Sequence, residues 1–123
     1  MLSYSTYNLV SSQTPEWTKR PPETKYALAG DNVTLEWDFD KDGGKLKSAR
    51  WGPQKDGVFQ KILVAWNQNK TPELRSPSKA LFEMNGTLTL LNVDINDTAM
   101  YMCDLSFESV TLTSTTHLIV VGK

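Results

Sequence analysis

The sequence predicts an all-β fold in which two sheets pack face to face as a sandwich. Turn signals recur along the chain, and no long stretch keeps the 3.6-residue apolar period of a helix. In residues 33–39, Val33, Leu35, Trp37 and Phe39 alternate with polar residues, as expected of a strand with one buried face. At 123 residues the chain is long enough for one domain with a single core.

The expected strands follow one another with short polar turns between them. The first is rich in proline, which has no N–H to donate, so we expect it at a sheet edge. Turns are expected at Asp42-Gly43-Gly44 and Lys55-Asp56-Gly57. The polar, proline-broken stretch 67–77 has room for one further short strand. The strands themselves are expected over residues 15–22, 33–39, 46–52, 59–66, 78–84, 87–93, 99–105 and 111–121.

The most specific motif is Asp-Thr-Ala-Met-Tyr-Met-Cys at residues 97–103, where Cys103 is the only cysteine of the chain. This motif resembles strand F of an immunoglobulin domain, in which Tyr101 would form the tyrosine corner and Cys103 would bond to strand B. At the matching place in strand B this chain has Trp37, and Trp51 follows at the distance expected of the buried strand C tryptophan. The resemblance implies an immunoglobulin-like two-sheet Greek-key sandwich that lacks the B–F disulfide.

The spacing of the motifs favours a subtype within that family. The stretch between Trp37 and Cys103 leaves room for the C′ and C″ strands of variable-type domains, whereas both chain ends look more like the intermediate set. The last strand lacks the Phe-Gly-x-Gly bulge of antigen-receptor domains. The resemblance also implies a basic partner for Asp97, and we expect Arg75, with Lys79 as the competitor. Residues 1–14 are expected to form an extension or first edge strand before the domain of residues 15–123.

We expect tryptophan packing to replace the missing disulfide. A bridge closing such a loop contributes about 4 kcal/mol. Trp37 and Trp51, packed beside Cys103, can offset much of that loss through buried area and ring contact, provided that the Trp37 N–H finds an acceptor. Strand alternation points Cys103 inward, so we expect an inert buried thiol rather than an intermolecular disulfide.

Four glycosylation acceptor patterns favour an extracellular protein. They begin at Asn32, Asn69, Asn85 and Asn96. Against this, strand-rich sequences are rich in threonine, and the lone cysteine fits a reducing compartment. No signal-peptide core follows Met1, and no apolar run is long enough to span a bilayer. We expect a cell-surface protein held at the membrane by a segment outside this sequence.

Several function classes have no support in the residues. Thirteen basic and fourteen acidic residues without charge runs give no case for nucleic acid or anionic lipid. His117 is the only histidine, and Asp94 and Asp97 fall at a turn where a solvated or salt-bridged role explains them. Catalytic triads, phosphate loops and metal-ligand clusters are absent. We expect no enzyme, no cofactor and no small-molecule substrate.

The resemblance implies recognition of another protein through the face of strands G, F, C and C′. With Tyr101 and Cys103 inward, the neighbouring methionines would point to solvent, where apolar groups mark interaction sites. The alternative is that the N-terminal segment 2–12, with its Tyr4, Tyr7, Leu9 and Val10, covers some of this face. The expected partner-binding face comprises Arg50, Ile62, Val64, Trp66, Met100, Met102, Asp104, Phe107 and Ile119, with the opposite parity of residues 62–66 left open.

Three functions remain open at this point. The first is a cell-surface receptor domain that recognises a copy of itself, as in invertebrate adhesion and allorecognition receptors. The second is a receptor or decoy domain that binds a different protein. The third is an intracellular structural immunoglobulin domain of a muscle or cytoskeletal scaffold. Glycans at three of the four asparagines would shield the other sheet or the end of the sandwich and leave the expected face open.

Overall fold

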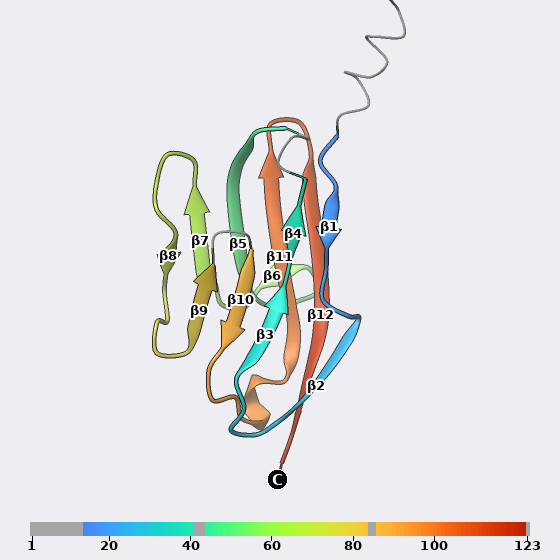
Figure 1. Cartoon of the computed structure of the whole chain (residues 1–123), viewed down its shortest axis with the longest axis vertical. Coiled ribbons are helices and arrows are strands. Elements are labelled where there is room, and N and C mark those ends of the chain that lie inside the picture. Colours follow the sequence, from blue (N-terminus) through green and yellow to red (C-terminus); the bar gives the residue numbers. More distant parts are fainter. Residues whose placement is uncertain (1–13, 41–43, 84–85, 123) are drawn as a thin grey trace, which may run out of the picture.

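The computed structural model describes residues 14–40, 44–83 and 86–122, which form two packed layers of strands (Figure 1). Residues 1–13, Asn85 and the Asp42-Gly43 part of the expected turn lie outside the described residues. The elements are β1 (Trp17–Lys19), β2 (Thr24–Leu28), β3 (Val33–Glu36), β4 (Asp38–Phe39), β5 (Leu46–Lys55), β6 (Val58–Phe59), β7 (Val64–Asn67), β8 (Glu73–Leu74), β9 (Ala80–Glu83), β10 (Thr87–Leu90), the 3-10 helix η1 (Ile95–Asp97), β11 (Ala99–Phe107) and β12 (Thr111–Val121).

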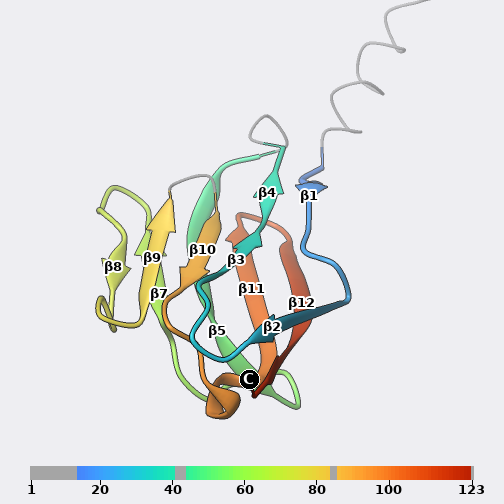
Figure 2. The ribbon, with the colours of Figure 1, turned by 60° about the horizontal axis from the view of Figure 1, so that its bottom comes forward.

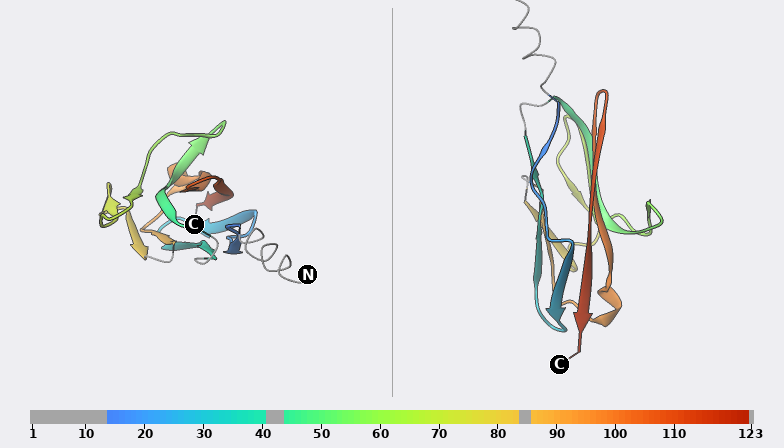
Figure 3. Two further views of the ribbon diagram at one scale, coloured as in Figure 1. Left: turned by 90° about the horizontal axis from the view of Figure 1, so that it is seen from above. Right: turned by 90° about the vertical axis from the view of Figure 1, so that its right-hand side faces the viewer.

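The larger layer has the strand order β2-β12-β11-β5-β7-β8, with β6 beside β5. The smaller layer has the order β3-β10-β9, and β1 pairs with β4 next to it. Figure 3 shows the two layers edge on, with the β11–β12 hairpin on one side and β3 on the other. The predicted all-β immunoglobulin-like sandwich is confirmed, and the stretch 67–77, which had room for one further short strand, contains β8.

The chain changes layers between β1 and β2. The sequence predicted one edge strand over residues 15–22, but β1 ends at Lys19 and pairs with β4 in the smaller layer. After Pro21 and Pro22 the chain crosses over, and β2 pairs parallel with β12 in the larger layer. Prolines cannot continue a ladder, which explains the break at this point.

Strand B is interrupted at Trp37, which lies between β3 and β4. At this point the backbone of strand B comes very close to Gly86, which lies just before β10. A Cβ on Gly86 would stand only 2.5 Å from the Trp37 carbonyl oxygen, and Gly86 has a φ of 109°. Both the space and the positive φ require glycine at this position.

The connection between β5 and β7 crosses the outer side of the larger layer. The predicted strand over residues 59–66 is wrong for residues 60–63, because β7 begins only at Val64. The Leu63 N–H donates to the Trp51 carbonyl at 2.8 Å, and a Cβ on Gly52 would lie 2.1 Å from the Lys61 carbonyl oxygen. In the edge-on view of Figure 3 this green segment projects from the sheet.

Candidate functional site

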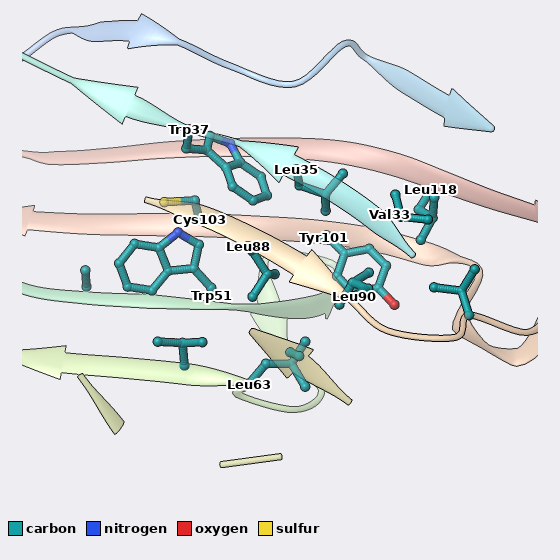
Figure 4. Close-up of a cluster of buried hydrophobic side chains, with 14 of the residues drawn as sticks. Val33, Leu35, Trp37, Trp51, Leu63, Leu88, Leu90, Tyr101, Cys103 and Leu118 are labelled. Atoms are coloured by element: carbon teal, nitrogen blue, oxygen red, sulfur yellow. The ribbon is translucent and has the colours of Figure 1, made fainter. Parts of the chain in front are cut away.

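The core around Cys103 is built from aromatic rings. Cys103 stands opposite Trp51 in the β11–β5 pairing, and Trp37 reaches the same place from the other layer (Figure 4). All three side chains are buried. The Trp37 Nε1–H donates to the Ser114 hydroxyl at 3.0 Å, so the buried indole has the acceptor that it needs. This hydrogen bond joins strand B (β3 and β4) to strand G (β12), whereas the disulfide of the family would join strand B to strand F (β11).

The indole N–H of Trp51, unlike that of Trp37, lacks a hydrogen-bond acceptor within the described part of the chain. Its Nε1 is buried and has no hydrogen-bond partner among the described residues. In Figure 4 this nitrogen faces the Cys103 sulfur, which is at best a weak acceptor. The Trp51 ring packs on Phe82 of β9 with the ring centroids 4.5 Å apart. Burial, and secondarily Asp104, raise the pKa of the Cys103 thiol, which therefore stays protonated and inert.

The tyrosine corner lies at the end of the sandwich that Figure 2 brings forward, beside η1. The Tyr101 hydroxyl donates to the Asp97 carbonyl at 2.7 Å. Burial, and then Asp97 and Asp94, raise the pKa of the Tyr101 phenol above its ordinary range. The Asp97 carboxylate accepts from the Asp94 N–H at 2.8 Å and thus caps η1. The Asp94 carboxylate in turn accepts from the Asn96 N–H at 2.7 Å, so both carboxylates hold the backbone of this corner.

The expected partner of Asp97 is wrong. Lys79, not Arg75, forms the ion pair with Asp97, at 2.7 Å, while Arg75 pairs with Glu73 at 2.7 Å. The backbone explains the choice. The Leu91 N–H donates to the Lys79 carbonyl, which ties Lys79 to the chain just before η1, whereas the Arg75 N–H donates to the Leu63 carbonyl just before β7.

The outer face of the larger layer, which we call the front face, carries a polar centre. The Arg50 guanidinium donates to the Asp104 carboxylate at 2.8 Å, and the Thr113 hydroxyl donates to the other oxygen of that carboxylate at 3.1 Å. The same guanidinium lies over the Phe59 ring, 5.0 Å from its centroid. Half of the Arg50 side chain remains exposed. These contacts hold an accessible cation in one orientation.

The methionines of strand F are less accessible than expected. Met100 and Met102 do share the outward parity with Asp104, but Met102 is only 6% exposed and Met100 is half-buried. The expectation that both face solvent is wrong for Met102. Met102 pairs with Gly52, and the connection between β5 and β7 passes directly over Gly52.

Three other residues expected on the front face point into the core. Val64 and Phe107 are buried, and Trp66 packs against the core from β7. The parity of β7 is therefore the alternative one left open by the sequence, and Ala65, opposite Arg50, points outward. Phe107 keeps the inward parity of Cys103 and meets Phe39 edge to face, 5.8 Å between centroids.

Ile62 and Ile119, the last two expected face residues, are both half-buried. Ile62 lies in the connection before β7 and is not part of a strand. Ile119 lies on β12 with the outward parity, since its neighbours Leu118 and Val120 are buried.

An apolar strip at the lower end of the front face was not predicted. Tyr26 stands opposite Ile119, and Leu28 stands opposite Val121, in the parallel β2–β12 pairing. Tyr26 is 69% exposed, Leu28 48% and Val121 43%. Residues 24–28 read Thr-Lys-Tyr-Ala-Leu, which lacks the polar–apolar alternation of a strand, and no strand was predicted there.

The glycosylation candidates that the structure describes are all exposed and lie off the strands of the front face. Asn32 lies in the turn before β3, Asn69 in the turn after β7 and Asn96 in η1. Asn85 lies outside the described residues.

Within the described ranges, no three His, Cys, Asp or Glu side chains gather as a metal ion would require. His117 is half-buried on β12, opposite Met100. The part of the chain that the structure describes contains no helix with the length and apolarity to cross a membrane.

The strand order, the tyrosine corner and the C′–C″ pair together define a variable-type immunoglobulin sandwich. A family model of the immunoglobulin V-set domain matches residues 20–121. The chain belongs to the immunoglobulin V-set family.

The chain is similar to part of one longer protein and to several solved structures. The chain is 27% identical over 122 residues to "Neural cell adhesion molecule L1" of Takifugu rubripes. The match covers 97% of this chain but only 8% of the length of that protein. Murine CRIg superimposes with a TM-score of 0.70 at 13% identity, over 87% of this chain and 98% of that one. Tim-1 gives 0.67 at 19% identity, over 81% and 92%. At these identities, the two structures show a shared fold.

Proposed function

We propose that this domain is an extracellular recognition module that binds a second copy of itself through the front face. The observation that carries the proposal is the anchored, accessible Arg50 guanidinium at the centre of a sheet that carries an apolar strip at one end. Arginine and aromatic residues supply most of the binding energy in protein interfaces. Arg50 is held by Asp104 and Phe59, so its orientation costs little entropy when a partner docks.

Self-recognition is favoured over a different partner by the composition of the face. It carries a cation and an anion side by side at its centre, and an apolar strip at one end. A two-fold contact places the same patch of both copies in register, so such a mixed face can meet its own charges with opposite charges. The likeness to an adhesion molecule adds to this support.

The extracellular assignment is supported by the three exposed sequon asparagines off the front-face strands. Expression of the full chain through a secretory route, followed by mass measurement with and without a glycosidase, tests the extracellular assignment. We expect a mass shift that a glycosidase removes, with loss of one step for each occupied site when its Thr is replaced by Ala. A secreted chain without any glycan would contradict the assignment and favour the intracellular structural domain, which commonly lacks the disulfide.

Sedimentation velocity of the full chain at rising concentration tests the homophilic form. We expect the sedimentation coefficient to rise toward that of a dimer. Arg50→Glu should abolish this rise, because it places a second carboxylate beside Asp104. Arg20→Glu, an exposed charge outside the front face, is the matched control and should leave it unchanged. Circular dichroism confirms that both variants fold.

A strict monomer at every concentration would overturn the homophilic form. In that case a binding screen with the intact ectodomain, carrying either native Arg50 or Arg50→Glu, tests whether the front face binds a different protein. Loss of a captured partner in that variant alone would keep the front face as the site.

A further inference from the structure

An apolar pocket of about 370 Å³ opens between the two layers, away from the front face. Four aromatic rings line it, from β4, β5, β7 and β9: Phe39, Trp51, Trp66 and Phe82. Trp51 and Phe82 pack on each other along one wall. Apolar walls gain free energy when a side chain rather than water occupies the space between them. The pocket therefore fits an aromatic or branched aliphatic side chain.

The beginning of the described chain lies next to this pocket. A Cβ on Gly44 would stand 3.6 Å from Pro15, so Pro15 lies against Gly44. Gly44 and Lys45 line the apolar pocket and also a neighbouring hollow that Thr14 and Pro15 line. The described chain thus begins beside Gly44 and Lys45, two residues that also line the apolar pocket.

That preceding chain has the right side chains within reach. Residues 1–13 include Tyr4, Tyr7 and the adjacent pair Leu9 and Val10, with small polar residues between and after them. An extended chain spans about 3.3–3.6 Å per residue, so Val10 can lie about 14 Å from Thr14 and Tyr7 about 24 Å. Leu9 and Val10 can therefore reach across Gly44, and Tyr7 has length to spare.

We propose that the pocket is the docking site of the chain's own N-terminal segment, with side chains from the Tyr7–Val10 stretch seated among Phe39, Trp51, Trp66 and Phe82. This site is independent of the front face, so it stands whether or not that face binds a second copy.

The test compares the full chain with a full-length variant in which Tyr4, Tyr7, Leu9 and Val10 are all replaced by Ser. Indole N–H resonances are recorded at a concentration where sedimentation shows a monomer. We expect the Trp51 and Trp66 resonances to move, while that of Trp37, which is bonded to Ser114, stays in place. The fluorescence of the dye ANS should rise several-fold, because the emptied pocket binds it.

Two controls make the outcome decisive. Replacement of Ser3, Ser5, Asn8 and Ser11 by Ala keeps the apolar side chains and should change neither signal. Adding a synthetic peptide of residues 1–13 to the four-serine variant should displace ANS and return the Trp66 resonance toward its original position. Unchanged Trp51 and Trp66 resonances, or a peptide without effect on them, would overturn the proposal. A change seen only when the native chain dimerises would overturn docking within one molecule.

Discussion

The Trp37 indole N–H donates to the Ser114 hydroxyl at 3.0 Å across the core of the sandwich. Each residue comes from a different layer, and both are buried. Ser114→Ala leaves the indole N–H buried without an acceptor, which costs about 1–3 kcal/mol. We expect the free energy of unfolding, measured by urea denaturation, to fall by that amount. Thr115→Ala, at the exposed neighbouring position, should change it by less than about 0.5 kcal/mol. Equal values for the two variants would show that the bond does not stabilise the fold.

Gly52 is required by the chain that crosses the front face. Its Cβ would stand 2.1 Å from the Lys61 carbonyl oxygen, which is backbone and cannot rotate aside. Gly52→Ala should therefore displace the connection between β5 and β7 at a cost of about 1–3 kcal/mol. It should also uncover Met102, which faster oxidation by dilute peroxide would report. Gly122→Ala, with open space around it, is the control and should match the native chain. Native stability and unchanged Met102 oxidation in the Gly52 variant would refute this reading.

The Lys79–Asp97 ion pair is expected to stabilise the E–F corner more than the exposed Arg75–Glu73 pair. Both pairs measure 2.7 Å, but Lys79 and Asp97 are the more buried partners. Lys79→Met should cost about 1 kcal/mol, and Arg75→Met less than about 0.5 kcal/mol. Thermal unfolding of the two variants side by side measures the difference. A larger loss for Arg75→Met would reverse the assignment of the Asp97 partner.

Stability should fall at alkaline pH. The pKa values of the Cys103 thiol and the Tyr101 phenol are raised by burial in the folded state. Unfolded, these groups ionise near pH 8.5 and pH 10, so above about pH 8.5 the unfolded chain releases protons that the folded chain keeps. The stability is thus fully present below that pH and declines as the pH rises. Urea midpoints between pH 7 and pH 11 measure the decline.

Two variants assign the alkaline effect to its groups. Tyr101→Phe should flatten the decline above about pH 10 and lower the neutral-pH stability by about 1 kcal/mol, through loss of the bond to the Asp97 carbonyl. Cys103→Ala should flatten the part that begins near pH 8.5. The native thiol should react with a disulfide reagent only in urea. Rapid labelling of the folded chain would contradict its burial.

Sequence reasoning reached the fold because the strand F motif carries several constraints in seven residues. Tyr101 and Cys103 set the inward parity of β11, and that parity held along the whole strand through Phe107. The motif could not say which of Lys79 and Arg75 meets Asp97, because that depends on how the turn before β9 is held by Leu91.

The binding face was predicted less well, for one physical reason. An outward parity places a side chain on a face, but exposure depends on what passes over that face. Met102 has the outward parity and is buried, because the chain around Lys61 crosses above Gly52. In the β5–β7 pairing, Val64 stands opposite Trp51 and Trp66 stands opposite Ala49, so both share the inward parity of those core residues.

The sequence by itself determined the all-β sandwich, the missing disulfide and the inward place of Trp37, Trp51 and Cys103, since alternation and spacing act along the chain. Only the tertiary structure decided that Ser114 completes Trp37, that β2 joins β12, and that an aromatic pocket opens beside Pro15. Each of these depends on residues far apart in sequence that strand pairing and the packing of the two layers bring together. No local sequence pattern encodes such contacts.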